Sequence, residues 1–393
     1  MFYELRPVGN RIKLASSGFD NNFLKPFSFI GFDSGTSALT TALIAVRRSK
    51  PTINNPKVLV PAYTCPDIVS ACLYAKVTPV LVDFESNLPF MDLDNLCSKI
   101  SDDCIAIIAI NFMGIPERIN AIRSAINTDH ITIIEDSAQG FPINRPVEYW
   151  SGDLIIVSFG RGKPVNLMGG GALFFDKKRL NSDLLSEVLN FEIKRPKFYI
   201  RHALLYRTKA ILFNLLSRPI FYFIVSRLPF LNLGTTAYHP LAKIGPLPNF
   251  IEKVIEHNYK NNYKDSSHFR EIRERYDELF GQLEETIISL PIKTKLPGNF
   301  PLLRYPILIL DKKLKQTIYQ KLIDLGLGAS LMYQTILPEV KDIEELMFET
   351  IEDYPNAKAL ADGLITLPMH QDIKLKHIKR MEKIILTTLA TSN

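Results

Sequence analysis

The sequence predicts an α/β domain with a mostly parallel central sheet, followed by a smaller α+β domain. Between Phe32 and Asp176, short apolar runs alternate with segments long enough to form crossover helices. Beyond residue 250, apolar residues recur at helical spacing before one further strand-like run. The chain has 393 residues and is 46% apolar, which favours two hydrophobic cores over one.

Six segments of the first part are typical of strands, because each is a short run rich in β-branched and other apolar residues. They are KVLVPAY (57–63), TPVLVDF (78–84), CIAIIAINF (104–112), ITIIED (131–136), LIIVSFG (154–160) and GALFF (171–175). Crossover helices are expected between them, for example over Ser37–Arg48 and Pro66–Ala75. Parallel sheets of this kind bind ligands at the carboxyl ends of their strands. Functional side chains are therefore expected in the loops that follow the strands.

The second part is predicted to begin with a long amphipathic helix over 250–287. A strand over 302–310 and helices over 312–325 and 373–389 follow it. These elements are typical of a small α+β domain. We therefore expect a large ligand-binding domain over 1–235, and the long helix with the small domain over 236–393.

The segment 194–233 differs from the rest of the chain in composition. It combines bulky apolar residues with eight Lys and Arg residues, and no Asp or Glu occurs between Ile193 and Ile251. No uncharged run approaches the roughly 20 residues of a transmembrane helix, and three prolines interrupt the segment. Three interpretations stay open: an insertion that completes a dimer interface or covers a site, a contact with an anionic membrane surface, and a nucleic-acid surface. The net charge of +6 is modest for this length, so we expect no nucleic-acid partner.

The four cysteines, at positions 65, 72, 97 and 104, form no CxxC pair and have no histidine at metal-ligand spacing. We therefore expect neither a metal site nor a disulfide framework. The first twenty residues contain no continuous apolar run of the kind found in a secretory signal. A cytoplasmic protein is expected, with peripheral contact at the inner face of the membrane as the alternative for segment 194–233.

A lysine among glycines, Lys163 in SFGRGKPVNLMGGG, is the first candidate for chemistry. The stretch superficially resembles the end of a nucleotide-binding P-loop. That motif needs a glycine where this chain has Val157, and a Ser or Thr where it has Pro164. The P-loop interpretation is therefore rejected.

A phosphate-binding turn is predicted at SGTSAL, residues 34–39. Gly35 allows a close approach of the backbone, and the amides of Thr36 and Ser37 open a helix whose N-terminus attracts an anion. Ser158, at the end of a later strand, supplies a further donor.

An acidic residue that can pair with a protonated ring nitrogen is predicted at Asp136, directly after an apolar strand. Gln139 lies three residues further on and can hydrogen-bond a ring substituent. A phosphate-binding turn, an acidic partner for a ring nitrogen and the amine of Lys163 together indicate pyridoxal 5'-phosphate as the cofactor.

The sequence resembles the DegT/DnrJ/StrS-type family of pyridoxal-phosphate sugar aminotransferases. The resemblance lies in GTSAL (35–39), VPAYT (60–64), EDSAQ (135–139), SFGRGK (158–163) and YPNAKALADGLITLPMHQDI (354–373). It covers nearly the whole chain except roughly 194–233.

This resemblance implies a fold-type I homodimer with active sites at the subunit boundary. It also implies that Lys163 forms an imine with the cofactor and that Asp136 pairs with the pyridine nitrogen. It places Gln139 beside the ring hydroxyl. The residues that it places around the phosphate are Gly35, Thr36 and Ser158.

The chain departs from the family pattern at two points. The family commonly has an aromatic residue where this chain has Cys65, and that residue stacks on the cofactor ring. Tyr63, two residues earlier, would share a face with Cys65 in a strand and is the substitute candidate. The family's Asn-x-Arg element is not visible, and GTTAYHP (234–240) occupies its place. Substrate recognition is therefore expected to differ.

The expected function is transfer of an amino group from an amino acid such as glutamate to a keto-sugar that is nucleotide- or lipid-linked. Such a product would serve a surface polysaccharide, for example lipopolysaccharide, or a secondary metabolite. Lys163 favours transamination over dehydration, because relatives with histidine at this position are dehydratases. The alternatives are a non-catalytic, membrane-associated member of the fold and another pyridoxal-phosphate reaction.

Overall fold

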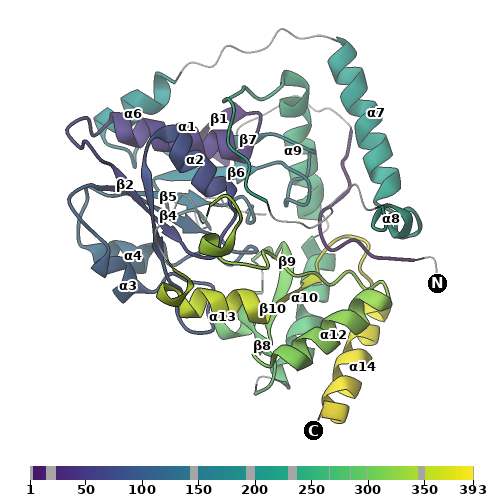
Figure 1. Ribbon diagram of the computed structural model, residues 1–393. Coiled ribbons are helices and arrows are strands. Elements are labelled where there is room, and N and C mark those ends of the chain that lie inside the picture. Colours follow the sequence, from purple (N-terminus) through teal and green to yellow (C-terminus); the bar gives the residue numbers. More distant parts are fainter. Residues whose placement is uncertain are drawn as a thin grey trace.

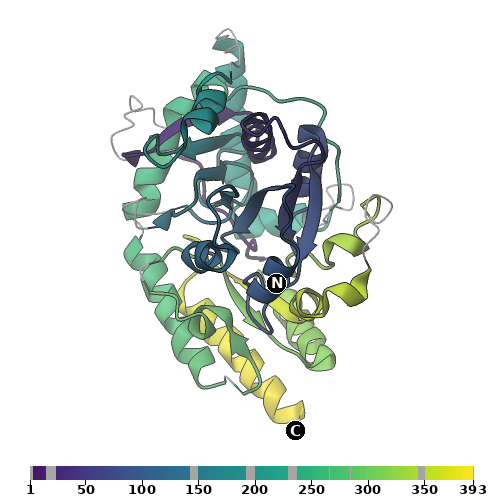
Figure 2. The same ribbon diagram turned by 90° about the vertical axis from the view of Figure 1, so that its left-hand side faces the viewer.

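The computed structural model of the protein describes residues 3–14, 24–141, 149–191, 200–228, 237–264, 266–283, 285–298, 300–343 and 350–392. A seven-stranded sheet forms the centre of the large domain, and a three-stranded sheet lies below it (Figure 1). In the view turned by 90° the small domain again lies below the large sheet (Figure 2). The boundary that we place between residues 235 and 236 remains a prediction.

The central sheet has the strand order β1-β7-β6-β5-β4-β2-β3. The neighbouring pairs from β6 to β3 are parallel, and β7 runs antiparallel to both β6 and β1. This confirms the predicted, mostly parallel α/β fold. The strands are β1 Ser28–Phe32, β2 Lys57–Pro61, β3 Thr78–Val82, β4 Cys104–Ile110, β5 Thr132–Asp136, β6 Leu154–Ser158 and β7 Gly171–Phe175.

The edge strand β1 was not predicted from the sequence. It is only five residues long and half-buried over most of its length, so its apolar pattern is weak. Gly31 interrupts that pattern for a packing reason, because a Cβ at Gly31 would lie 2.8 Å from the Cβ of Leu247. The formation of β1 therefore depends on its pairing with β7 and on its packing against the segment around Leu247.

Helix α1, Gly35–Arg48, packs on the central sheet against β6 and β7, with α2 and α6 beside it. Ser34 caps α1, since its Oγ accepts a hydrogen bond from the N–H of Ser37 at 3.0 Å. Arg47 and Arg48 lie in the last turn, where cations are favoured. The other short helices of this domain are α2 Asp67–Ala75, α3 Leu93–Ser98, α4 Ile119–Ile126 and α6 Ser182–Leu189.

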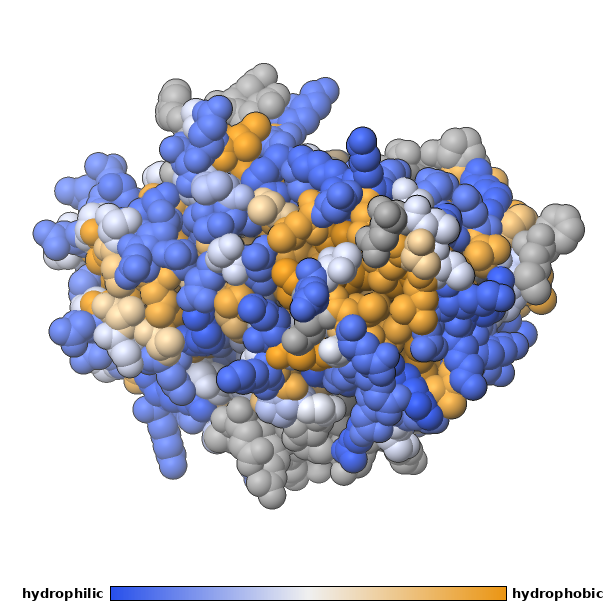
Figure 3. Space-filling view, turned by 90° about the horizontal axis from the view of Figure 1, so that it is seen from below, coloured by the Kyte–Doolittle hydropathy of each residue, from blue (hydrophilic) through white to orange (hydrophobic). Residues whose placement is uncertain are grey.

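The small domain is built on the antiparallel sheet β10-β9-β8. Its strands are β8 Ile288–Ser289, β9 Arg304–Leu308 and β10 Leu364–Pro368. Its helices are α10 Ser266–Gly281, α11 Leu290–Lys293, α12 Lys312–Asp324, α13 Pro355–Gly363 and α14 Leu375–Ser392. Seen from below, this side of the molecule shows an apolar area bordered by hydrophilic side chains (Figure 3).

Helices occupy most of the range 250–287 in which one long helix was predicted. They are α9, Asn249–Lys264, and α10, Ser266–Gly281, and Asp265 between them lies outside the described residues. Apolar residues of α9 share a core cluster with Trp150 and Phe174, and the ring of Tyr259 packs against Phe141, whereas α10 contributes to the larger core that spans both sheets.

Helices α7, Ile200–Leu216, and α8, Pro219–Val225, stand at the edge of the molecule (Figure 1). Among the described residues, no helix has both the length and the apolar character needed to cross a membrane by itself. Helices α7 and α8 meet those two criteria only as a pair, and they are bent by 97° relative to each other.

Candidate active site

Three of the predicted site residues meet at one edge of the central sheet. Strand β5 ends at Asp136 and the neighbouring parallel strand β6 ends at Ser158, so both side chains stand at the carboxyl edge. Helix α1 begins at Gly35, and the residue before it bridges to Gly170, which precedes β7. The strand ends thus bring together residues from three separate sequence motifs.

Gly35 and Ser158 are in direct contact. A Cβ added to Gly35 would lie 2.9 Å from the Cβ of Ser158, which is closer than two such atoms approach. Only glycine therefore fits between the start of α1 and the end of β6. The first N–H groups of an α-helix have no partner within the helix. Together with the Ser158 hydroxyl they form a suitable cradle for a phosphate.

We predict that Gly35→Ala lowers the affinity for pyridoxal 5'-phosphate at least about tenfold, or about 1.4 kcal/mol. The added methyl group would displace Ser158 from the cradle, while alanine at the start of α1 preserves the helix. The affinity can be measured by absorbance titration.

The matched control is Gly169→Ala, because no atom lies within 4 Å of a Cβ built at Gly169. Equal affinities of the two variants would contradict the cradle at Gly35 and Ser158.

Ser37, expected to help bind the phosphate, has both of its donors engaged inside the chain. Its N–H donates to Ser34, its hydroxyl donates to Asp33 at 2.6 Å, and its side chain is fully buried. Ser37 thus fixes the turn that opens α1. Thr36 is less buried, and its hydroxyl donates to Asp67 Oδ2 at 3.3 Å.

Asp136 and the preceding Glu135 point to opposite sides, as successive residues of a strand do. Glu135 is buried below the site and accepts hydrogen bonds from Asn111 Nδ2 at 2.7 Å and from the N–H groups of Ser151 and Gly152 at 2.8 Å. Asp136 faces the site, and its Oδ1 accepts the N–H of Ala138 at 2.9 Å. Asp136 is thus the carboxylate that a ligand can reach.

The charge of Asp136 depends on its surroundings. Burial raises the pKa of this carboxyl group, whereas the Ala138 N–H and the nearby ammonium of Lys163 lower it. Lys163 is thus close enough to Asp136 to interact with it electrostatically. A second cation beside the carboxylate would further favour the charged form.

The loop that carries Lys163 is held in place from two sides. Gly162 has a φ of +72°, a conformation that favours glycine. The N–H of Lys163 donates to the carbonyl of Gly160 at 3.3 Å, and Asn166 Nδ2 donates to the carbonyl of Asn10 at 3.0 Å. The Nζ of Lys163 forms no hydrogen bond with any residue that the structure describes. The backbone is fixed, and the amine is left for a ligand.

Gln139 and Cys65 are linked through Tyr333, which the sequence did not indicate. Gln139 Oε1 accepts the N–H of Met113 at 3.0 Å, and its Nε2 donates to the Tyr333 hydroxyl at 3.3 Å. The Cys65 thiol is hydrogen-bonded to Tyr333 as well, and burial raises the pKa of this thiol to about 11. Cys65 is therefore a protonated, weakly polar neighbour of the site at neutral pH.

Tyr63, the substitute candidate for ring stacking, does not share the half-buried position of Cys65. Strand β2 ends at Pro61, so the alternation that would pair the two residues does not reach them. Tyr63 is fully buried, its ring packs against Phe112 and Tyr333, and its hydroxyl donates to the carbonyl of Met332. Tyr63 therefore packs behind Tyr333 and helps to hold it in position.

Arg304, at the start of β9, is a second site neighbour that the sequence did not indicate. Its Nη1 donates to the hydroxyls of Ser330 and Thr366, while its buried Nε has no partner. No carboxylate of the described residues lies within 4 Å of it. Burial lowers the pKa of Arg304 to about 10, and Tyr333 and Tyr63 lie near enough to affect it. The only sequence feature that could have indicated Arg304 is its position as a single arginine at the start of an apolar strand.

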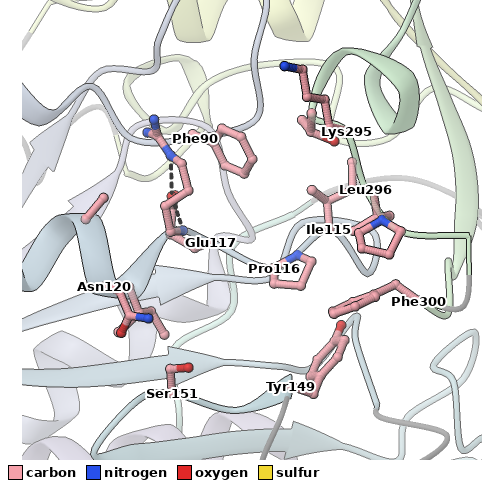
Figure 4. Close-up of a pocket in the computed structure, with 15 residues that line it drawn as sticks. Phe90, Ile115, Pro116, Glu117, Asn120, Tyr149, Ser151, Lys295, Leu296 and Phe300 are labelled. Carbon is pink, nitrogen blue, oxygen red and sulfur yellow. Dashed lines mark hydrogen bonds and ion pairs between the residues drawn. The ribbon is translucent and has the colours of Figure 1, made fainter.

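A pocket of about 340 Å³ lies between the loop after β4 and the segment 294–300 (Figure 4). The rings of Tyr149 and Phe300 pack against each other at a tilt of 30° at one end of it, and Glu117 lies at the other. Glu117 accepts the N–H groups of Met91 and Arg118, and burial raises its pKa to about 7. Neither Asp136 nor Ser158 lines this pocket.

The residues at the sheet edge fit pyridoxal phosphate in three respects. The contact between Gly35 and Ser158 leaves a helix start open to a phosphate, Asp136 offers a carboxylate, and Lys163 offers an amine. No group of three or more His, Cys, Asp or Glu suited to a metal ion occurs in the described part of the chain. Of the GTTAYHP segment (234–240), which replaces the family's Asn-x-Arg element in the sequence, residues 234–236 lie outside the described residues.

Comparison with solved structures finds the same fold in proteins of low sequence identity. A putative sugar aminotransferase from Streptococcus pneumoniae in its PLP form is 19% identical, with 94% of this chain and 88% of that chain covered and a TM-score of 0.66. Helicobacter pylori PseC, an aminotransferase of pseudoaminic acid biosynthesis, is 17% identical, with 92% and 87% covered and a TM-score of 0.65.

A sequence relative is the GDP-perosamine synthase of Escherichia coli O157:H7, 28% identical over 149 residues. This alignment covers 37% of the present chain and spans 40% of the length of that relative. The model of the DegT/DnrJ/EryC1/StrS aminotransferase family matches residues 20–199 and 264–385, which is well over half of the chain. The resemblance stated from the sequence is confirmed, and the chain belongs to the DegT/DnrJ/EryC1/StrS aminotransferase family.

Proposed function

We propose that this protein is a pyridoxal-phosphate-dependent aminotransferase that converts a keto-sugar into an amino-sugar. The observation that carries the proposal is the meeting of Asp136, Lys163 and the Gly35–Ser158 cradle at one sheet edge. Membership of the family supports it. The amino donor is an amino acid such as glutamate, and the sugar is nucleotide- or lipid-linked. The product serves a surface polysaccharide or a secondary metabolite.

Each site residue has a definite task in this proposal. The first turn of α1, with Gly35 and Thr36, binds the phosphate together with Ser158. Asp136 pairs with the ring nitrogen and keeps it protonated, and Gln139 lies beside the ring hydroxyl. When bound, the cofactor withdraws electrons from the substrate carbon that carries the amino group.

Lys163 moves the proton during the reaction. Its Nζ accepts the proton from the donor's α-carbon and later delivers a proton to the sugar carbon that receives the amino group. A flexible amine in a fixed loop suits this task, because Nζ can reach both positions while the backbone stays in place. Transamination needs an amine that moves this proton, and the presence of Lys163 is therefore the reason to favour transamination over dehydration.

The test of the proposal is the half-reaction with glutamate. The visible absorbance of the protein with pyridoxal phosphate should bleach on addition of glutamate, and one equivalent of 2-oxoglutarate should form per site. A protein that binds the cofactor but shows neither change would favour the non-catalytic alternative.

Arg304 is proposed to bind an anionic group of the amino donor. A buried guanidinium with a free Nε and no carboxylate neighbour among the described residues carries an uncompensated charge. We expect Arg304→Met to raise the KM for glutamate about tenfold or more, with a much smaller change in kcat. Arg304→Lys should restore part of the affinity.

The measurement is steady-state kinetics with each substrate varied in turn. A merely structural role of Arg304 would lower kcat and the melting temperature and leave the KM for glutamate unchanged. That result would contradict the proposal.

The assembly and location follow from the same proposal. The protein is a cytoplasmic homodimer in which the two subunits complete each other's sites. Light scattering of the purified protein tests the dimer, since a monomer with full activity would contradict it. The large domain ends near residue 235.

A further inference from the structure

The helix pair α7–α8 exposes an unusual amount of apolar surface. Ten of the seventeen large apolar side chains that are exposed in the described residues lie on this pair or directly after it. We call this set the α7–α8 surface: Ile200, Leu204, Leu205, Ile211, Leu212, Leu215, Ile220, Phe221, Ile224 and Leu228. Exposed apolar patches of this kind mark sites of contact with proteins or membranes.

Helix α7 is apolar on sides that nothing in the chain covers. It contacts the body of the protein through Tyr206 and Ala210, which are buried. Leu204 and Ile211 lie on one exposed side, with 66% and 60% of their surface accessible, and Leu205 and Leu212 lie on another, with 52% each. A helix that is apolar on most sides is normally buried or in contact with lipid.

The pair is held in a fixed position by the N-terminal segment. Asn214 Oδ1 accepts the N–H of Ile12 at 2.8 Å, and Asn214 Nδ2 donates to the carbonyl of Ile12 at 2.7 Å. The N–H of Glu4 donates to the carbonyl of Pro219 at 3.1 Å. The α7–α8 surface is therefore presented in one orientation, and its exposure does not come from a loosely attached helix.

Positive charge surrounds this surface. Exposed arginines and a lysine lie along the pair at positions 201, 207, 209, 218 and 227, and no acidic residue occurs between Ile193 and Ile251. Arg227 is paired with Glu4 of the N-terminal segment, so the other four positions supply the positive charge. Long basic side chains can keep their charge at lipid phosphates while their stems cover apolar surface. A second copy of the chain would bring the same positive charges together, so charge complementarity favours an anionic surface.

The surface also lies outside the parts of the chain that match the family. The family model covers residues 20–199 and 264–385, and both α7 and α8 fall in the interval between them. The shared fold therefore gives no account of these exposed apolar side chains.

We propose that α7 and α8 dock on the surface of an anionic lipid bilayer. The apolar side chains enter the boundary between headgroups and acyl chains, and the basic residues contact lipid phosphates. The pair lies at the interface and does not cross the bilayer, because its two helices are bent by 97° and neither is long enough alone. This inference does not depend on the proposed transamination.

Flotation with vesicles tests the inference on the full chain. We expect the wild-type protein to float with vesicles of phosphatidylcholine that contain phosphatidylglycerol, and much less with phosphatidylcholine alone. Flotation should weaken as salt rises, because screening reduces the attraction. The double variant Ile211→Glu, Ile220→Glu should reduce the bound fraction at least about tenfold.

The matched control is Leu310→Glu, since Leu310 is 54% exposed and lies outside the pair. It should float like the wild type, and both variants should keep the wild-type melting temperature. Failure of the wild type to float, or equal losses in the two variants, would overturn the inference. A change of oligomeric mass in the double variant without wild-type flotation would also overturn it, because the surface would then join two copies of the chain.

Discussion

Replacing Lys163 by alanine is expected to abolish turnover and the absorbance band of the imine between this lysine and the cofactor. The proposal gives Nζ the task of moving the proton, and a positioned acid–base group contributes about a hundredfold to ten-thousandfold to the rate. Loss of the attachment point for the cofactor adds to this effect. We therefore expect the rate to fall by more than about a thousandfold.

The fold should survive this substitution. Nζ forms no hydrogen bond with the described residues, and the loop is held by the backbone of Gly160 and by Asn166. Arg161→Ala, an exposed position in the same loop, is the matched control. Melting temperature, absorbance spectrum and turnover are measured for both variants. A Lys163→Ala protein that turns over normally would refute the assignment.

Asp136→Asn is expected to bind the cofactor weakly and to lose most of its activity. Asparagine has the same shape and keeps an oxygen for the N–H of Ala138, so the strand end should retain its conformation. It lacks the negative charge that holds the ring nitrogen protonated, and the electron-withdrawing power of the ring depends on that proton. We expect a loss of at least about a hundredfold in kcat.

Two measurements separate this effect from a structural one. Titration with pyridoxal phosphate gives the affinity, and single-turnover kinetics at saturating cofactor give the rate. Asn111→Ala is a useful comparison, because the side chain of Asn111 donates to the buried Glu135 and not to the carboxylate of Asp136. Asn111→Ala should lower the melting temperature with a smaller loss of rate. A near-normal rate in Asp136→Asn would remove the role given to this carboxylate.

The large domain could be predicted from the sequence because its buried parallel strands are continuous apolar runs, such as CIAIIAI in β4. The edge strand β1 was not predicted, because a half-buried strand interrupted by a glycine has no continuous apolar run.

The site was predictable where it is made by strand ends. Asp136 and Ser158 each follow an apolar strand directly, so their place at the sheet edge follows from the α/β architecture. Tyr333 lies in a loop and Arg304 begins strand β9 of the small domain. No local sequence motif indicates that either residue lies near the site. Tyr63 was placed by strand alternation, which fails because β2 ends two residues earlier.

In the proposed function, Lys163 holds pyridoxal phosphate at the carboxyl edge of the central sheet. Reduction of the loaded protein with sodium borohydride fixes the cofactor covalently to the lysine that carries it, and peptide mass spectrometry then identifies that lysine. We expect the label on the peptide that contains SFGRGK, at Lys163. A label on another lysine, or no label on protein that has bound the cofactor, would contradict the account.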